Sequence, residues 1–145
     1  MLFKRKIYSK LLAWKTEANG RKALLVEGAR RIGKSTVVEE FAKNEYKSYI
    51  LIDFARATDD VKSYFIRHLN DLDTLYMLLS VHYGVKLYDR ESIIIFDEVQ
   101  LYPKAREAIK YLVADGRYDF IETGSLISIK ENVRDILIPS EERHL

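Results

Sequence analysis

One eight-residue segment, 28–35, constrains the fold of this chain more than any other part of its sequence. It reads Gly-Ala-Arg-Arg-Ile-Gly-Lys-Ser and fits the pattern G-x-x-x-x-G-K-[ST] at every fixed position. An apolar run at 23–27 precedes it, and apolar residues at helical spacing follow it over 36–45. Glycines at these positions let consecutive backbone N–H groups surround a phosphate. The sequence therefore predicts a phosphate-binding loop that joins a buried strand to a helix.

Side chains of this loop have separate predicted roles. Lys34 brings its charge to the β- and γ-phosphates of a nucleotide, and the Ser35 hydroxyl is placed to ligate Mg²⁺. The helix that begins here adds unpaired N–H groups and its positive dipole end. The side chains of Arg30 and Arg31 are expected to face solvent or a partner surface instead of the phosphates.

Strands and helices alternate along the rest of the chain, which predicts an α/β fold with a mostly parallel sheet. Residues 4–18 read as an amphipathic helix that Asn19-Gly20 ends. Further strands are expected at 47–53, 92–96 and 118–123, and further helices at 58–69, 73–82 and 103–114. After Ser125 the pattern is mixed helix or loop and ends in a polar segment. At 145 residues we expect one domain, 1–145, with a substantial core.

Composition excludes several classes of function. The chain has no cysteine, and its three histidines lack metal-ligand spacing, so disulfides and a zinc enzyme are not expected. A net charge of +2, without a basic run, does not indicate a nucleic-acid partner, although it leaves one open. No apolar run is long enough to cross a bilayer and no signal peptide is recognisable, so a cytoplasmic location is expected.

An acidic pair, Asp97-Glu98, ends the apolar run of the 92–96 strand. A carboxylate at the end of a buried strand, downstream of a phosphate loop, suits Mg²⁺ beside Ser35, and this is the role predicted for Asp97. Glu98 then stands where it could polarise the water that attacks the γ-phosphate. The alternative is a surface turn opened by two acidic residues. For Gln100, a turn-capping role is favoured over contact with the metal-bound water.

Thr123-Gly124-Ser125 forms a polar tip on the last expected strand. If this strand lies between the phosphate-loop strand and the acidic strand, its hydroxyls point toward the γ-phosphate and the attacking water. A hydroxyl-rich turn is the other interpretation, and the residues alone do not choose between the two.

Taken together, the segments 28–36, 93–100 and 123–125 resemble those of AAA+-type ATPases. The resemblance is to a bacterial and archaeal group of predicted ATPases that often carries a C-terminal domain of unknown function. It implies a P-loop NTPase three-layer sandwich that binds ATP and Mg²⁺. It also implies Asp97 and Ser35 on the metal, Glu98 as base, and a sensing hydroxyl at Thr123 or Ser125. It places Gly28, Gly33, Lys34, Ser35 and Thr36 on the nucleotide. The predicted cofactor-binding segment also includes the loop residues Ala29, Arg30, Arg31 and Ile32.

Members of that group continue beyond the point that corresponds to Leu145. The chain is therefore expected to be truncated before the fifth core strand and to lack the family's C-terminal part. The edge of the 23–27 strand would then be exposed, or covered by a second copy or a partner protein. Arg134 and Arg143 are the late candidates for an arginine that contacts the γ-phosphate.

The leading functional hypothesis is a Mg²⁺-dependent ATPase core coupled to a partner that the sequence does not identify. The alternative is a nucleotide-binding switch or interaction module that hydrolyses little or nothing. A small-molecule kinase is less favoured, because it does not need Asp-Glu on a separate strand. GTP is not expected, since the sequence has no Asn-Lys-x-Asp motif.

Overall fold

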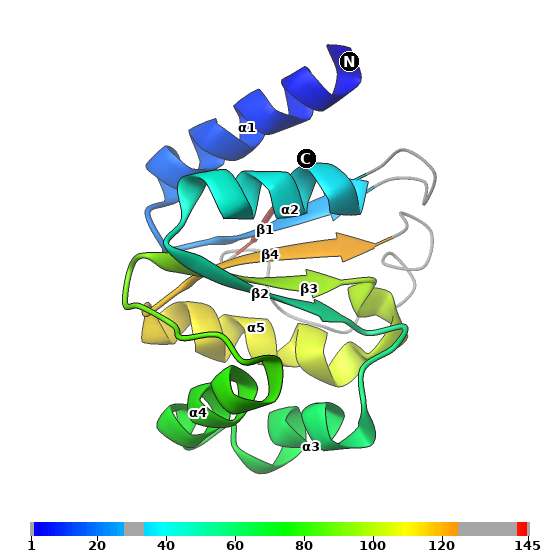
Figure 1. Ribbon diagram of the computed structural model, residues 1–145, viewed down its shortest axis with the longest axis vertical. Helices are drawn as coiled ribbons and strands as arrows, with labels where there is room; N and C mark the ends of the chain where they lie inside the picture. The colour runs from blue at the N-terminus through cyan, green and yellow to red at the C-terminus, as the bar shows by residue number, and fades with distance from the viewer. Residues whose placement is uncertain (1, 28–33, 125–141, 145) are drawn as a thin grey trace.

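A five-stranded parallel sheet forms the centre of the computed structural model, which describes residues 2–27, 34–124 and 142–144 (Figure 1). The strands stand in the order β2-β3-β4-β1-β5, and each pairs in parallel with its neighbours. Their bounds are β1 Ala23–Glu27, β2 Ser48–Asp53, β3 Ser92–Asp97, β4 Asp119–Gly124 and β5 Glu142–His144. The parallel α/β sheet that the sequence predicted is confirmed, and β4 lies between β3 and β1.

Helices cover both faces of this sheet and complete three layers (Figure 1). On one face lie α1 (Leu2–Ala18) and α2 (Lys34–Glu45). The other face carries α3 (Asp59–Arg67), α4 (Leu72–Tyr83) and α5 (Pro103–Asp115), and a short 3₁₀ turn, η2 (Val99–Leu101), precedes α5. None of the helices in the described ranges is long and apolar enough to cross a membrane.

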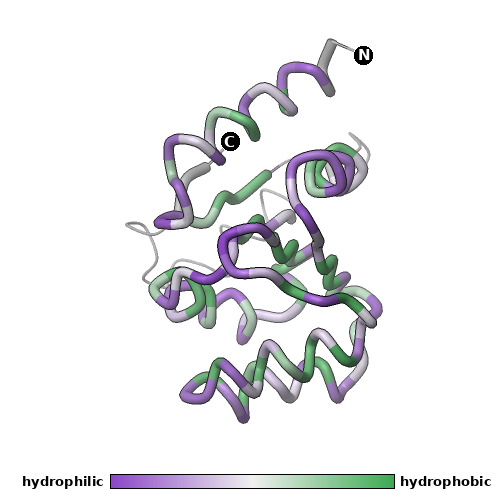
Figure 2. The backbone as a smooth tube through the Cα atoms, turned by 60° about the vertical axis from the view of Figure 1, so that its left-hand side comes forward, coloured by the Kyte–Doolittle hydropathy of each residue, from purple (hydrophilic) through white to green (hydrophobic). Residues whose placement is uncertain are grey.

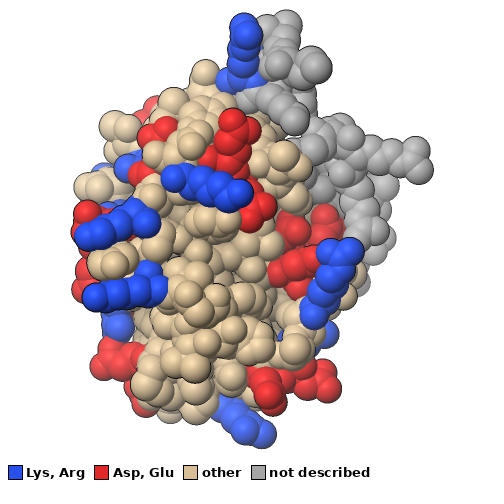
Figure 3. Space-filling view, in the orientation of Figure 1, with Lys and Arg blue, Asp and Glu red and all other residues tan. Residues whose placement is uncertain are grey.

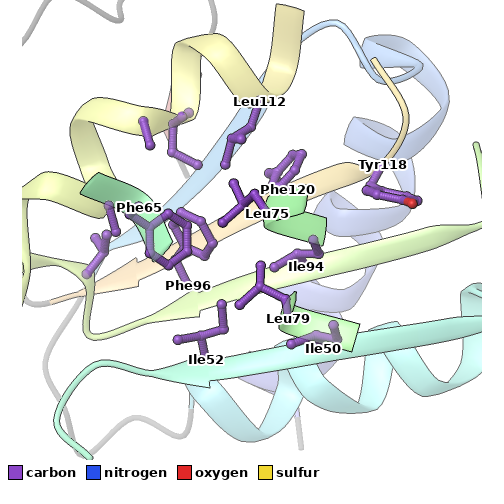
Figure 4. Close-up of a cluster of buried hydrophobic side chains, with 14 of the residues drawn as sticks. Ile50, Ile52, Phe65, Leu75, Leu79, Ile94, Phe96, Leu112, Tyr118 and Phe120 are labelled. Carbon is purple, nitrogen blue, oxygen red and sulfur yellow. The ribbon is translucent and has the colours of Figure 1, made fainter. Parts of the chain in front are cut away.

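The larger apolar cluster fills the space between the sheet and the helices α3, α4 and α5 (Figure 4). Alternate residues of β2 and β3, and Phe120 of β4, point into it, as the two-residue repeat of a strand requires. Phe96 of β3 is at its centre and makes edge-on contacts with the rings of Phe54, Phe65 and Phe120. Burial of this face therefore fixes the positions of β3 and β4, whose ends carry the acidic pair and the polar tip.

A second apolar cluster lies between the sheet and the helices α1 and α2. It takes the intervening strand residues, including Ile95 of β3 and Ile121 of β4. Trp14 of α1 is 1% exposed, and its indole N–H donates to the carbonyl of Lys22 at 3.1 Å. Because both faces of the sheet are covered, the central strands β1 and β3 are near-continuous apolar runs. Along the helices, hydrophobic and hydrophilic residues alternate (Figure 2).

Strand β5 corrects one expectation from the sequence. The resemblance implied truncation before the fifth core strand, so the edge of β1 was expected to be exposed, or covered by a second copy or a partner protein. In the structure, residues Glu142–His144 pair in parallel with Ala23–Leu25 of β1 and occupy that edge. The segment is polar and short, so its strand geometry comes from hydrogen bonding along the edge of β1 and not from a hydrophobic pattern. The sheet thus has a fifth strand, although one of only three residues.

Candidate functional site

Three elements bring polar side chains together at the carboxyl end of the sheet. Asp97 is the last residue of β3, Thr123 is next to the last residue of β4, and Ser35 is the second residue of α2. In a parallel sheet all strands end at the same edge, which is where α/β proteins bind their ligands. Acidic side chains are visible at this end in the space-filling view, with a basic one beside them and further acidic ones elsewhere on the same face (Figure 3).

The Asp97 carboxylate is the centre of this group. Its Oδ1 accepts a hydrogen bond from the Ser35 hydroxyl at 2.7 Å and a second from the Thr123 hydroxyl at 2.5 Å. Thr123 is fully buried, Asp97 is 9% exposed, and Ser35 is half-buried. The three residues are 26 and 62 positions apart in sequence, so only the fold brings them together.

Thr123 also holds the backbone of Glu98. The backbone N–H of Glu98 donates to Thr123 Oγ1 at 3.2 Å, so one hydroxyl links both acidic residues to β4. The last backbone pair between β3 and β4 joins Phe96 and Glu122, the residues just before Asp97 and Thr123. The threonine side chain therefore continues the connection between the two strands beyond the last backbone pair.

Glu98 has the left-handed conformation, with φ 55° and ψ 48°. Such a conformation is unfavourable for a residue with a side chain and persists only where its surroundings impose it. Glu98 is 6% exposed, and its Oε1 accepts a hydrogen bond from Gln100 Nε2 at 2.7 Å. The sequence favoured a turn-capping role for Gln100, and the structure puts its amide on the Glu98 carboxylate.

The model of the AAA domain family matches residues 20–139. The chain belongs to the AAA domain family. The matched range includes the phosphate-loop segment, the acidic pair and the polar tip, so the resemblance found in the sequence is confirmed.

The chain was also compared with solved structures and with curated proteins. Among solved structures, this AAA domain is similar to C. elegans PCH-2, at 13% sequence identity and a TM-score of 0.48. That alignment covers 97% of this chain and 41% of the other, so the chain spans less than half the length of that protein. No curated protein matches the chain.

Part of the predicted site lies outside the described residues. This applies to Gly28, Ala29, Arg30, Arg31, Ile32 and Gly33 of the loop, to Ser125, and to Arg134. Lys34 is the first residue of α2, and Thr36 is exposed on the same turn. Arg143 is the central residue of β5, which runs beside β1.

The oxygen atoms around Asp97 suit a hard divalent cation. A hydroxyl and a carboxylate are in direct contact there, and Mg²⁺ prefers oxygen ligands of this kind. Within the described residues no group of three or more His, Cys, Asp or Glu is placed to hold a metal ion. Mg²⁺ in nucleotide sites is usually held by one or two carboxylates with water and phosphates, and this donor set fits that case.

The sequence analysis missed a buried ion pair beneath the site. Arg106 Nη1 of α5 lies 2.6 Å from Glu122 Oε2 of β4, and the two side chains are 1% and 0% exposed. Two features of the sequence indicate this ion pair. Arg106 lies three residues before Ile109 on the inner face of its helix, and Glu122 interrupts the apolar run of its strand.

A polar network also ties the opposite, amino ends of the strands together. Asp119, the first residue of β4, accepts hydrogen bonds from Arg90 at 2.7 Å and from the Tyr46 hydroxyl at 2.5 Å. Burial raises the pKa of Tyr46 well above its ordinary value, and the Asp119 carboxylate raises it further. This network is remote from Asp97, at the other end of the sheet, and is structural.

Proposed function

We propose that this AAA domain binds ATP with Mg²⁺ and hydrolyses the bond between the β- and γ-phosphates. The single observation that carries the proposal is the linkage of Ser35, Thr123 and Glu98 through Asp97 and the Thr123 hydroxyl. It joins the start of the helix after the phosphate loop to the ends of two neighbouring strands. That is the position a nucleotide's terminal phosphate and its metal ion would share.

In this proposal the loop backbone over 28–33, Lys34 and Thr36 hold the nucleotide. Ser35 and Asp97 would hold Mg²⁺, which when bound neutralises charge on the phosphates. Thr123 keeps the Asp97 carboxylate oriented through its short hydrogen bond. Ser125 would supply a second hydroxyl to the γ-phosphate.

Glu98 is the proposed general base. Water attacks the γ-phosphorus, the bond to the bridging oxygen breaks, and ADP leaves with that oxygen. The proton of the attacking water passes to the Glu98 carboxylate. A positioned base typically contributes about 10²–10⁴-fold to a rate, so removing it has a large and measurable effect.

A second function, a nucleotide-dependent switch with little hydrolysis, has one observation in its favour. Glu98 is almost completely buried, and its Oε1 already accepts a hydrogen bond from Gln100. If that contact persists when ATP binds, the carboxylate is held away from water and turnover stays low. The two functions share the nucleotide site and differ only in turnover.

Nucleotide binding is tested by calorimetry with ATP and Mg²⁺ on the wild type and Lys34→Ala. We expect the variant to lose measurable affinity while its fold is retained. Lys43→Ala is the matched control, because it removes an exposed lysine from the last turn of the same helix. Unchanged ATP affinity in Lys34→Ala would contradict the site assignment.

Turnover is tested by phosphate release from the wild type and Glu98→Gln, with Glu40→Gln on the exposed surface of α2 as control. We expect kcat to fall about 10²-fold or more in Glu98→Gln and to stay unchanged in the control. If the wild type binds ATP but releases no more phosphate than Glu98→Gln does, the switch is the function of this chain.

The edge of the sheet beyond β5 is a surface for a partner of the proposed ATPase. β5 is the outermost described strand on its side of the sheet, and a sheet edge is a surface on which another chain can pack. We propose that a second copy or a partner protein packs beyond it. A cytoplasmic location also stays a prediction.

A further inference from the structure

We propose that the buried ion pair between Arg106 and Glu122 is a positioning device that fixes Glu98 and Thr123 relative to each other. The inference rests on the proposed function, because it assigns these two residues a part in the hydrolysis step. Neither residue touches the reacting atoms, so both are positioning residues and not catalytic ones.

The pair lies inside the apolar layer between the sheet and α5. Glu122 is on the same face of β4 as Phe120, and Arg106 shares the inner face of α5 with Ile109 and Leu112. Figure 4 shows Phe120 and Leu112 directed into this layer from β4 and α5. Both charged side chains are thus withdrawn from water among hydrophobic neighbours.

Such a pair is a poor source of stability. Moving two charges out of water is so unfavourable that a well-packed apolar pair of similar volume is often equally stable or more so. What the ion pair adds is direction, because the 2.6 Å contact allows one relative position of helix and strand. Apolar side chains in the same space can slide past each other.

The position that this contact fixes is next to the site. Arg106 is on the first turn of α5, and the chain reaches that turn from Glu98 through η2. Glu122 is the last residue of β4 in register with β3, and Thr123 follows it. On one face of the sheet, the Thr123 hydroxyl therefore accepts a hydrogen bond from the Glu98 backbone. On the other face, Arg106 of the helix that follows Glu98 pairs with Glu122, the residue before Thr123. Two ties on opposite faces prevent the Glu98 turn from rotating about the end of β4.

The decisive variant replaces both charges by apolar residues of similar shape, Arg106→Met with Glu122→Leu. We expect it to fold with a thermal midpoint at or above that of the wild type. Hydrogen exchange followed by NMR should show the Glu98 amide exchanging about tenfold faster, while that of Ile94 in the same strand stays slow. kcat for ATP should fall about tenfold to hundredfold, because small displacements of reacting groups have effects of this size. KM should change less than twofold.

Three further variants separate positioning from general loosening. Each single substitution removes the 2.6 Å ion-pair contact from a charge that stays buried, and we expect those proteins to be much less stable than the double variant. Arg106→Lys keeps the charge but not the planar guanidinium, so its kcat should lie between those of the wild type and the double variant. The matched control is Arg90→Gln with Asp119→Asn, which removes the ion pair at the other end of β4. It should leave the Glu98 amide and kcat unchanged.

A double variant whose Glu98 amide exchanges as slowly as in the wild type overturns the proposal, whether or not ATP is hydrolysed. Faster exchange with an unchanged kcat also overturns it, because the position of Glu98 would then not matter for turnover. Failure of the proposed function gives a different result. In that case wild-type protein shows no ATP affinity that depends on Lys34, while the exchange measurement still decides whether the pair positions Glu98.

Discussion

Replacing Thr123 by valine removes the one hydroxyl that connects β4 to both acidic residues. The side chain is fully buried and keeps nearly the same shape, so the change isolates the hydrogen bonds. Two bonds are lost, the one donated to the Asp97 carboxylate at 2.5 Å and the one accepted from the Glu98 amide at 3.2 Å. A hydrogen bond to a charged group contributes about 1.5–3 kcal/mol, and a buried amide left without its acceptor costs about 1–3 kcal/mol. Allowing about 1 kcal/mol for the extra apolar burial, we expect the free energy of unfolding to fall by about 1.5–5 kcal/mol.

Thr123→Ser is the matched control, because it keeps the hydroxyl and removes the buried methyl group. Loss of one buried methyl typically costs about 0.5–1.5 kcal/mol. Urea unfolding of the three proteins, followed by circular dichroism, gives the order wild type, serine, valine. ATP turnover should also depend on the hydroxyl. We expect kcat of Thr123→Ser to be close to the wild-type value and kcat of Thr123→Val to be about tenfold or more below it. A valine variant as stable as the serine variant would refute the reasoning, since the hydroxyl would then contribute no more than a methyl group.

Two predictions concern the opposite end of the sheet. Tyr46→Phe should lower stability by about 1 kcal/mol at pH 7. It should also reduce the loss of stability at alkaline pH. Burial and Asp119 raise the pKa of Tyr46 in the folded protein. The contribution of Tyr46 to stability is therefore complete below pH ~10, and it is lost at higher pH as tyrosine ionises in the unfolded chain. Urea midpoints on both sides of pH ~10 measure this, and an unchanged slope would contradict it. Gly20→Ala should lower stability more than Gly116→Ala does. The two glycines have similar φ values, 81° and 79°, so the backbone strain is alike. Only at Gly20 would the new Cβ meet a neighbour, at 2.6 Å from the Arg90 guanidinium. Equal losses in thermal unfolding would show that Arg90 moves away freely.

The helices and strands could be predicted because local signals and tertiary packing agree. The expected strand at 23–27 coincides with β1, and the expected helix at 103–114 differs from α5 by one residue. The helix predicted to begin at Asp73 begins one residue earlier, since Asp71 caps it by accepting from the amide of Thr74. Such differences arise where a side chain outside the hydrophobic repeat decides the boundary.

The features that could not be predicted are those that join distant parts of the chain. β5 has no apolar pattern, so nothing in its own residues indicates a strand. Arg106 and Glu122 look like two separate exceptions to an apolar pattern, and only the packing of α5 on β4 makes them one pair. The polar tip was predicted from its position, but not that the Thr123 hydroxyl would bond to the acidic pair itself. Pairing across elements depends on register and crossing geometry, which a residue pattern does not specify.

The backbone of Glu98 explains why these long-range contacts gather around one residue. A left-handed glutamate costs about 1–3 kcal/mol relative to an ordinary conformation, and its own sequence offers nothing to offset that. The structure offsets it with the amide bond to Thr123, the carboxylate bond from Gln100, and the complete burial of Val99 that follows. Strain of this kind survives only where neighbours over-determine it, and among the described residues of the site it falls on the residue proposed as the base. A surface turn, the other interpretation of Asp97-Glu98, would need none of these constraints.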